Sequence, residues 1–329
     1  MKQRSLEVRQ CTLPIRGVFR ISRGSKTLAE SIVVRIEEQG RVGNGECVPY
    51  GRYGESIESV AAQIRSVAPA VEEGIDLLEL QSLLPPGSAR NAIDCALWDL
   101  RSRLAGRTVA SFAGFGDTLE PVVTAFTLSL DEPEAMAEKA REFAHLPLLK
   151  LKLGGDGDLE RVRAVRRAAP KARLMADANE SWQPRHLDAF LPEFAELGME
   201  LLEQPLPAGA DDALLGYASP VPLAADESCR DLRSIADIRT KYAFANIKLD
   251  KTGGLTEALA LADAARAAGM KVMVGCMVAS SLSMAPGIVL AQKAAVVHLD
   301  GPLLLARDHE PALRYEGATL FPDAKVWST

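Results

Sequence analysis

The feature that most constrains this chain is a series of short apolar runs, each ending in a charged residue. The runs are KLKLG (150–154), MADAN (175–179), LLEQP (201–205), LAADES (223–228) and NIKLDK (246–251). The charged residues are Lys152, Asp177, Glu203, Asp226 and Lys248, separated by 25, 26, 23 and 22 residues. Such a gap is about the length of one strand, one crossover helix and two loops. The spacing therefore predicts five successive parallel strands whose charged residues share one end.

Three further strand-like segments extend the series to eight. The expected strands are 122–128, 148–153, 172–177, 199–203, 221–225, 245–249, 271–275 and 295–299. Amphipathic segments such as 158–169 and 255–269 separate most of them. This pattern indicates an α/β fold, a closed parallel (β/α)7β TIM-like barrel without a clear eighth helix. An open doubly wound sheet is the alternative, but eight evenly spaced units favour closure.

Residues 1–118 follow a different pattern from the rest. Segments 31–40 and 41–50 are typical of two strands joined by a turn, and helical spacing follows over 56–72 and 88–104. Strands followed by helices predict an α+β domain over 1–118. The barrel is expected over 119–305. The segment 306–329, rich in proline and loop residues, is expected to pack back on the N-terminal domain.

Composition narrows the functional classes. The net charge of −6 is spread along the chain, which argues against a nucleic-acid partner. No apolar run reaches the roughly 18–20 residues needed to cross a bilayer, and the first residues lack the apolar core of a signal peptide. The five cysteines are scattered, odd in number and without a CxxC pair, as expected for buried thiols in a reducing compartment. We therefore expect a cytoplasmic protein without a membrane segment.

The three acidic strand ends predict a metal site. The ends of neighbouring barrel strands meet at the C-terminal rim, where active sites of this architecture lie. Asp177, Glu203 and Asp226 would repel one another there unless a cation lay among them. Oxygen ligands suit Mg²⁺ better than zinc, which favours histidine or thiolate. A single carboxylate could equally cap a helix or pair with arginine, but three on consecutive strands favour the metal.

The two lysines of the series suggest which reaction the metal would assist. Lys152 and Lys248 end the strands that flank the acidic ones, so they face each other across the barrel mouth. A free lysine, with a pKa of about 10.4, is a poor base, but a nearby cation lowers that value. Two opposed lysines could remove a proton from one face of a carbon and return one to the other. If that carbon lies next to a carboxylate, the metal would stabilise the resulting enediolate. The structural alternative for either lysine alone is a salt bridge.

The motifs KLKLG, DANESW, EQPLP, ADES and NIKLDKTGGL resemble the enolase superfamily, in the subgroup of muconate-lactonizing enzymes. The likeness is greatest to dipeptide epimerases acting on L-Ala-D/L-Glu, and it extends from SRGSKT (22–27) to LDGP (299–302). It implies Mg²⁺ on Asp177, Glu203 and Asp226, and acid/base roles for Lys152 and Lys248. Residues 1–118 would then be the cap over the barrel mouth. The resemblance implies a small-molecule dipeptide substrate and leaves a homo-oligomer open.

The resemblance also implies substrate contacts, with one departure. Relatives carry an Asp-x-Asp pair that holds the dipeptide ammonium, whereas this chain has His298 and Asp300. The histidine removes one negative charge and could itself become cationic near pH 6.5. Lys150 would hold the substrate carboxylate, and Arg23 would face an acidic side chain. The remaining expected pocket residues are Tyr53, Thr124, Cys276 and Met277.

Three functions are therefore compared. The first is Mg²⁺-dependent epimerisation of a dipeptide by two-lysine 1,1-proton transfer. The second is an o-succinylbenzoate synthase or muconate cycloisomerase type of lyase reaction, in which one lysine is the base. Asp300 suits an ammonium group and disfavours a purely anionic substrate, which supports the first. The third is a non-catalytic binding protein, which would have no use for two opposed bases.

Overall fold

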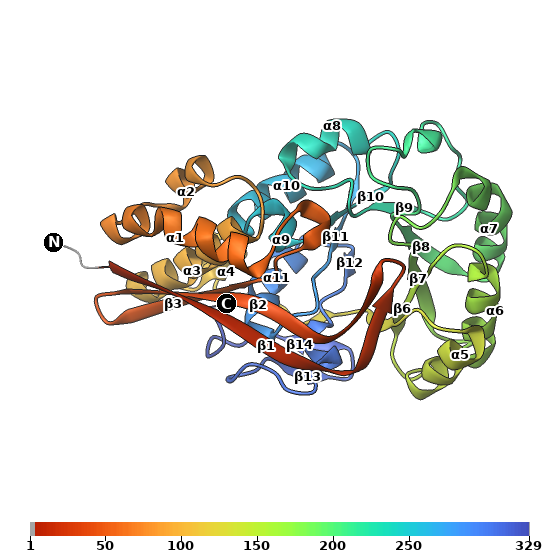
Figure 1. Ribbon diagram of the computed structural model, residues 1–329, viewed down its shortest axis with the longest axis horizontal. Coiled ribbons are helices and arrows are strands. Elements are labelled where there is room, and N and C mark those ends of the chain that lie inside the picture. Colours follow the sequence, from red (N-terminus) through yellow and green to blue (C-terminus); the bar gives the residue numbers. More distant parts are fainter. Residues whose placement is uncertain (1–3, 329) are drawn as a thin grey trace.

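The computed structural model describes residues 4–328, and its N-terminal part is a three-stranded sheet covered by helices (Figure 1). The sheet is antiparallel, in the order β1 (Arg4–Ile21), β2 (Gly24–Glu38), β3 (Arg41–Cys47). A short turn η1 (Gly51–Tyr53) follows, and then α1 (Ile57–Glu73), α2 (Leu77–Leu83), α3 (Ser88–Ala105) and α4 (Val109–Phe112). The turn of the long β1–β2 hairpin reaches the barrel, where Ser22 Oγ donates to the carbonyl of Asn179 at 3.0 Å.

Helix α3 lies directly on strand β3, and two glycines allow that approach. A Cβ atom on Gly45 would collide with the carbonyl of Ala92, and one on Gly43 with the backbone of Ala96. Glycine in a strand often marks such a close contact between backbones. The helix is buried along nearly its whole length, so this contact fixes how the cap is built.

The second part is a curled parallel sheet of eight strands. Their order in the sheet follows the chain: β5 (Phe126–Leu128), β6 (Leu148–Lys152), β7 (Arg173–Asp177), β8 (Met199–Glu203), β9 (Leu223–Ala225), β10 (Phe244–Ile247), β11 (Lys271–Val274) and β12 (Val296–Val297). The first and last strands meet where Ala125 N donates to the carbonyl of Val297 at 2.9 Å. The predicted TIM-like α/β fold with an N-terminal cap is confirmed.

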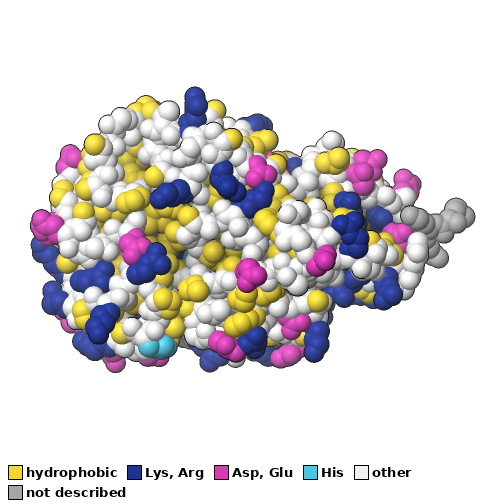
Figure 2. Space-filling view, turned by 180° about the vertical axis from the view of Figure 1, so that it is seen from behind, with side chains coloured by type: hydrophobic (Ala, Val, Ile, Leu, Met, Phe, Trp, Pro, Cys, Tyr) yellow, Lys and Arg dark blue, Asp and Glu magenta, His cyan; other side chains and the backbone are white. Residues whose placement is uncertain are grey.

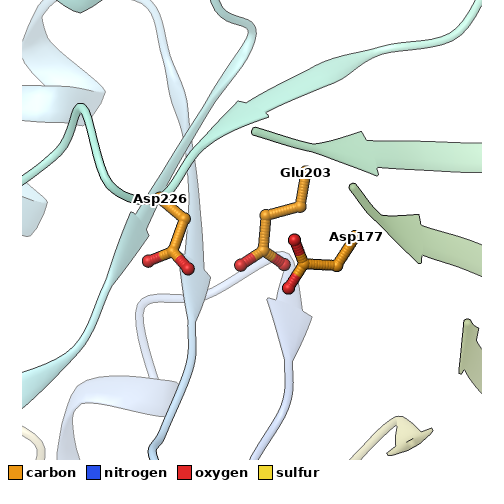
Figure 3. A group of neighbouring side chains, drawn as sticks. All are labelled: Asp177, Glu203 and Asp226. Atoms are coloured by element: carbon orange, nitrogen blue, oxygen red, sulfur yellow. The ribbon is translucent and has the colours of Figure 1, made fainter. Parts of the chain in front are cut away.

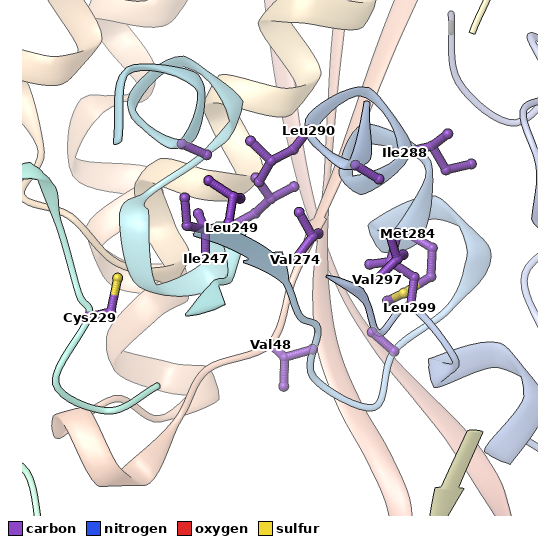
Figure 4. Close-up of a cluster of buried hydrophobic side chains, with 14 of the residues drawn as sticks. Val48, Cys229, Ile247, Leu249, Val274, Met284, Ile288, Leu290, Val297 and Leu299 are labelled. Carbon is purple, nitrogen blue, oxygen red and sulfur yellow. The ribbon is translucent and has the colours of Figure 1, made fainter. Parts of the chain in front are cut away.

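Helices cover the outside of this sheet (Figure 1). They are α5 (Pro133–Glu142), α6 (Asp158–Ala168), α7 (Pro184–Glu196), α8 (Ile235–Ile238), α9 (Leu249–Thr252), α10 (Leu255–Ala267) and α11 (Ser281–Ala291), with short 3₁₀ turns η2 (Asp212–Leu214), η3 (Leu232–Ser234) and η4 (Gly301–Leu304). Outward-facing side chains of the strands pack on them. Val274 and Val297, for example, lie in one apolar cluster with Met284 and Ile288 of α11 (Figure 4).

The side chains inside the barrel form layers of different polarity. At the N-terminal ends of the strands one apolar layer fills the barrel: Ala125, Leu148, Met175, Leu201, Ala224, Phe244 and Met273, with Val296 against them. Side chains repeat every second residue on one face of a strand. Two positions further along, the inward residues are Thr127, Lys150, Asp177, Glu203, Asp226, Asn246, Gly275 and His298. The inward-facing residues are therefore apolar in one layer and mostly polar or charged in the next, two residues further along each strand.

Residues 122–128, expected to be one strand, belong to two sheets. Strand β4 (Val122–Val123) pairs with β14 (Thr319–Phe321), which pairs with β13 (Arg314–Glu316), while β5 begins the barrel. The chain changes partners between Thr124, whose N–H donates to Ala318, and Ala125, whose N–H donates to Val297. A continuous apolar sequence gives no sign that its first residues pair in one sheet and its last residues in another. The 18-residue strand β1 was also not predicted.

The C-terminal residues lie against the N-terminal part. Trp327 is buried, and its Nε1 donates to the carbonyls of Asn44 at 3.0 Å and Cys95 at 3.2 Å. Ser328 N donates to Asp99 Oδ1 at 3.0 Å. These contacts are of the kind predicted for 306–329. The domain boundaries themselves stay predictions.

On the face shown in Figure 2, basic and acidic side chains are interspersed. Within residues 4–328, no helix combines the length and the apolar character needed to span a membrane. The cytoplasmic location stays a prediction.

Replacing Gly45 by alanine should destabilise the protein, because the new Cβ would overlap the backbone of α3. We expect Gly45→Ala to lower the free energy of unfolding by about 1–3 kcal/mol, the usual cost of overpacking, measured by denaturant titration. Gly51→Ala is the matched control, since a Cβ there meets nothing within 4 Å. Equal stability of the two variants would contradict the proposed close packing.

Candidate active site

A cavity of about 430 Å³ lies between the cap and the C-terminal ends of the barrel strands. Its walls come from both parts. The cap contributes the β1–β2 hairpin and the 48–52 loop, and the barrel contributes strand ends including Lys152, Asp226, Lys248 and Asp300. The volume falls within the range usual for small-molecule sites.

Three carboxylates meet at the C-terminal ends of neighbouring barrel strands, and one of them, Asp226, lines the cavity (Figure 3). Asp177 and Glu203 end β7 and β8, and Asp226 follows β9. One oxygen from each lies within 4.8 Å of the others, and all three side chains are buried. The all-oxygen donor set and its buried negative charge fit a hard divalent cation such as Mg²⁺.

Four lysine ammonium groups surround these carboxylates. Lys152 Nζ lies 2.5 Å from Asp177 Oδ2, and Lys248 Nζ lies 2.6 Å from Asp226 Oδ2. Below them, Lys150 donates to Glu203, and it lies 3.4 Å from Asp177. Lys251 Nζ lies 2.6 Å from Asp226 Oδ1. The site is thus an alternation of buried charges, in which removal of one partner leaves the other uncompensated.

The carboxylate pKa values reflect this arrangement. Against the cost of burial, Lys152 and Lys150 hold the pKa of Asp177 below its usual range. In the same way, Lys248 and Lys251 hold the pKa of Asp226 well below its usual range. Burial, together with the charge of Asp177, raises the pKa of Glu203 to about 7.

The pKa of Lys248 reflects its carboxylate neighbours. Burial acts to lower its pKa, but the carboxylates of Asp226 and Glu203 outweigh burial and raise it well above the usual value. The lowered lysine pKa expected beside a bound cation stays a prediction. In this arrangement Lys248 is protonated.

Neighbouring groups fix the carboxylates in place. Asn246 Nδ2 donates to Glu203 Oε1 at 2.6 Å, and Asn179 Nδ2 donates to Asp177 Oδ2 at 3.0 Å. Gly275 leaves room for this network, because a Cβ there would lie 2.6 Å from Asn246 Oδ1 and 2.9 Å from Lys248 Cε. These contacts explain why the inward series of side chains is interrupted by a glycine.

The backbone is strained next to two of the carboxylates. Asn179 and Glu180, just after Asp177, have φ of 46° and 65°. Gln204, directly after Glu203, has φ of 34°. Positive φ in residues other than glycine is costly and tends to occur at functional sites. The strain supports a functional role for these strand ends.

His298 and Asp300 form a pair in the cavity wall. Burial, aided by the Lys150 charge and opposed by Asp300, lowers the pKa of His298 to about 4. The ring is therefore neutral at pH 7. Because the Lys150 ammonium faces Nδ1 at 3.2 Å, the proton is on Nε2, which lies 3.0 Å from Asp300 Oδ1. The expectation that this histidine becomes cationic near pH 6.5 is not met.

The other expected contacts divide into two groups. Arg23, Cys276 and Met277 line the cavity. The other three expected residues, Lys150, Tyr53 and Thr124, are not among the described residues that line the cavity. Lys150 lies beneath the carboxylates.

Tyr53 and Thr124 have other partners. Tyr53 packs edge-on against Tyr50 and under the guanidinium of Arg230. Thr124 Oγ1 bonds to the backbone of Ala125 and Leu299, at the point where the barrel closes. Thr127, three residues further along, lines the cavity instead.

Several residues of the site were missed at the sequence level. Asn246 lies two residues before Lys248 and so shares its strand face, which the two-residue period could have shown. Lys251 lies one helical turn after Lys248, on α9. Lys26 and Tyr50 come from the cap, and nothing in their local sequence pattern places them at the barrel mouth.

The comparisons with known proteins agree with this geometry. Residues 3–114 match the model described as mandelate racemase / muconate lactonizing enzyme, N-terminal domain, and residues 134–321 match the model described as enolase C-terminal domain-like. The chain therefore belongs to the enolase superfamily, in the mandelate racemase and muconate-lactonizing group.

Relatives and solved structures cover nearly the whole chain. An L-Ala-D/L-Glu epimerase from Escherichia coli (strain K12) is 47% identical over 95% of this chain and 98% of its own length. An N-acetyl-D-glutamate racemase from Pseudoalteromonas sp. is 42% identical, over 88% and 92%. An enolase family member from Agrobacterium tumefaciens, solved with sodium and L-Ala-L-Glu, has a TM-score of 0.97 and 47% identity, over 98% and 99%.

A metal-bound structure is also similar to this chain. A dipeptide epimerase from Enterococcus faecalis V583, solved with Mg and L-Leu-L-Tyr, has a TM-score of 0.90 and 28% identity, over 98% of each chain. Together with the buried triad, this supports magnesium as the cofactor.

Removing one carboxylate charge should weaken metal binding. We expect Glu203→Gln to lower Mg²⁺ affinity about tenfold or more, because it removes an anionic ligand while keeping the size of the side chain. Isothermal titration calorimetry measures this directly. In the unaltered protein, Mg²⁺ at 100 times its dissociation constant should stabilise the fold by about 2.7 kcal/mol. Asp263→Asn, at a side chain 61% exposed, is the control, and equal affinity in both variants would refute the triad as the ligand set.

Proposed function

We propose that this protein is a magnesium-dependent dipeptide epimerase of the L-Ala-D/L-Glu type. The observation that carries the proposal is the placement of Lys152 and Lys248. Lys152 ends β6, Lys248 follows β10, and both line the cavity. Strands β7, β8 and β9, at whose ends the carboxylates lie, are between β6 and β10 in the sheet. If the triad holds a cation, a substrate carboxylate attracted to that cation would lie between the two ammonium groups. Inversion at a carbon next to that carboxylate needs such an arrangement.

The two lysines exchange the α-proton in this proposal. One, as the free amine, removes the proton from one face of the α-carbon, while the other, as the ammonium, donates a proton to the opposite face. The pair must start with one member protonated. Each lysine contacts a carboxylate of the triad, Lys152 at Asp177 and Lys248 at Asp226. The reverse reaction exchanges the two roles.

Magnesium, when bound by Asp177, Glu203 and Asp226, supplies positive charge beside the substrate carboxylate. The chain's own residues contribute the rest. Asn246 and Asn179 hold the carboxylates in position, and Lys251 anchors Asp226 through its second oxygen while Lys248 interacts with the substrate.

Asp300 is the proposed contact for the substrate's amino end. It is an acidic cavity residue without a lysine or arginine in ion-pair contact among the described residues; its neighbours are the neutral His298 ring and the N–H of Thr127, at 2.7 Å from Oδ2. A dipeptide ammonium would give that buried charge a cationic partner. The names of the E. coli relative and the A. tumefaciens structure support this substrate class.

A second candidate is racemisation of an N-acylated glutamate. The observation that favours it is His298, whose neutral ring stands where a second carboxylate would favour an ammonium group, and the Pseudoalteromonas relative is named for such a substrate. The lysine chemistry is the same in both candidates. The lyase and cycloisomerase alternative has no comparable observation in its favour here.

The test is incubation with Mg²⁺ in D₂O, followed by mass spectrometry and chiral chromatography. We expect L-Ala-L-Glu to take up one deuterium at the glutamyl α-carbon and to convert to L-Ala-D-Glu. Lys152→Ala and Lys248→Ala should each slow interconversion by about 10²–10⁴-fold, the usual contribution of a positioned acid or base. Lys139→Ala, at an exposed side chain on α5, is the matched control.

Parallel incubation with N-acetyl-L-glutamate decides between the two candidates. Faster conversion of the N-acetyl compound would replace the dipeptide by the second candidate. Absence of exchange with either substrate, with turnover of a succinylbenzoate precursor, would overturn both.

A further inference from the structure

The short helix α9 follows Lys248 directly and is held between the barrel and the cap. On the barrel side, Lys251 Nζ donates to the carbonyl of Asn246 at 2.8 Å. On the cap side, Arg90 of α3 donates through Nη2 to the carbonyl of Thr252 at 2.6 Å. The N–H groups of Lys251 and Thr252 in turn donate to the carbonyl of Lys248, at 3.0 Å and 3.1 Å. The position of Lys248 therefore depends on how both sides hold this helix.

Asp250 is the acidic residue of α9, two positions after Lys248, and its side chain is buried. A single carboxylate oxygen, Oδ1, accepts two hydrogen bonds from the cap, from Val48 N and from Asn91 Nδ2, each at 2.9 Å. Among the described residues, no lysine or arginine forms an ion pair with Asp250. Burial raises its pKa to about 7, against the opposing effect of these two hydrogen bonds. Asp250 therefore serves as a buried hydrogen-bond acceptor between the barrel and the cap.

The hydrogen bond from Val48 ties Asp250 to a wall of the cavity. Val48 begins the cap loop 48–52, and every residue of that loop lines the cavity. Among the described residues, this is the one hydrogen bond between the loop and α9. Burial raises the pKa of Tyr50 in the middle of the loop, and the charge of Lys248 is among those that oppose the rise. The loop thus lies within electrostatic reach of Lys248, and Asp250 links the two.

We propose that Asp250 is a positioning residue that holds Lys248 and the cap loop 48–52 at a fixed spacing. Asp250 is not among the described residues that line the cavity, so it acts through Lys248 and not on the substrate. The inference rests on the proposed function and adds the route by which the cap controls one of the two lysines. The carboxylate contributes an acceptor atom at the right place, and its charge is not required.

Loss of this carboxylate would affect one lysine only. The donors of Val48 and Asn91 would lack their partner in a buried region, a cost that a shift of α9 or of the loop would relieve. Strands β7, β8 and β9 separate β10, which Lys248 follows, from β6, which Lys152 ends. The shift would therefore displace Lys248 and leave Lys152 in place. A small displacement of a reacting group slows its reaction steeply.

The test compares deuterium uptake by the two epimers. Initial rates in D₂O with Mg²⁺ are measured for L-Ala-L-Glu and, separately, L-Ala-D-Glu, and Lys248→Ala identifies the epimer whose exchange needs Lys248. We expect Asp250→Ala to slow exchange of that same epimer by about 10- to 100-fold at saturating substrate. Exchange of the other epimer, and KM for both, should stay near the values of the unaltered enzyme. Asp250→Asn, which keeps Oδ1 for both donors, should restore the lost rate.

Asp99→Ala is the matched control for loss of a buried carboxylate. Asp99 lies on α3 in the cap, and its two oxygens accept the N–H groups of Asn44 and Ser328, each at 3.0 Å. Any slowing in this variant should be the same for the two epimers. If Asp250→Ala does not fold, Asp250→Ser replaces it, because its hydroxyl is too short to reach both donors, and the same one-sided loss is expected.

The outcomes separate this inference from the proposed function. Equal slowing of both epimers in the Asp250 variants, or no slowing, would overturn the positioning role while the unaltered enzyme still exchanged both epimers. A rate that Asp250→Asn fails to restore would also overturn it. Absence of exchange in the unaltered enzyme, or loss of both epimers in Lys248→Ala, would instead overturn the proposed function and this inference with it.

Discussion

The mutual repulsion of three buried carboxylates is the constraint on which this structure depends. Asp177, Glu203 and Asp226 lie within 4.8 Å of one another in the protein interior. Such an arrangement is tolerated only with cations close by. The fold supplies four lysine ammonium groups around them, and the donor set leaves a place for a divalent cation. Two of these four lysines, Lys152 and Lys248, are the ones proposed to exchange a proton, so charge balance and the proposed chemistry share residues.

The strand period explains how one barrel holds both a core and a site. Apolar side chains such as Leu201 and Met175 fill the N-terminal end, and two residues further along the same strands Glu203 and Asp177 belong to the carboxylate triad. Because the period of a strand is two, charged residues at strand ends could be assigned to one face from spacing alone. For this reason the triad and both lysines could be identified in the sequence, and the fold with them.

Other features could not be predicted, for physical reasons that differ from case to case. The run 122–128 is uniformly apolar, and nothing local marks the change of hydrogen-bond partners at Thr124. Lys26 and Tyr50 reach the cavity through the placement of the cap on the barrel, which depends on contacts distant in sequence. The neutral state of His298 follows from the burial of its ring beside Lys150, and burial is a property of the fold. Residue type and spacing locate a site, whereas charge state depends on the assembled surroundings.

The most direct measurement of the central claim is the stereochemistry of proton exchange in single-lysine variants. Lys152→Ala and Lys248→Ala are each incubated in D₂O with L-Ala-L-Glu and, separately, with L-Ala-D-Glu, and deuterium uptake is followed without requiring inversion. If the lysines lie on opposite faces of the α-carbon, each variant keeps exchange with one epimer only, and the two variants keep opposite epimers. Retention of exchange with the same epimer in both variants would contradict the account.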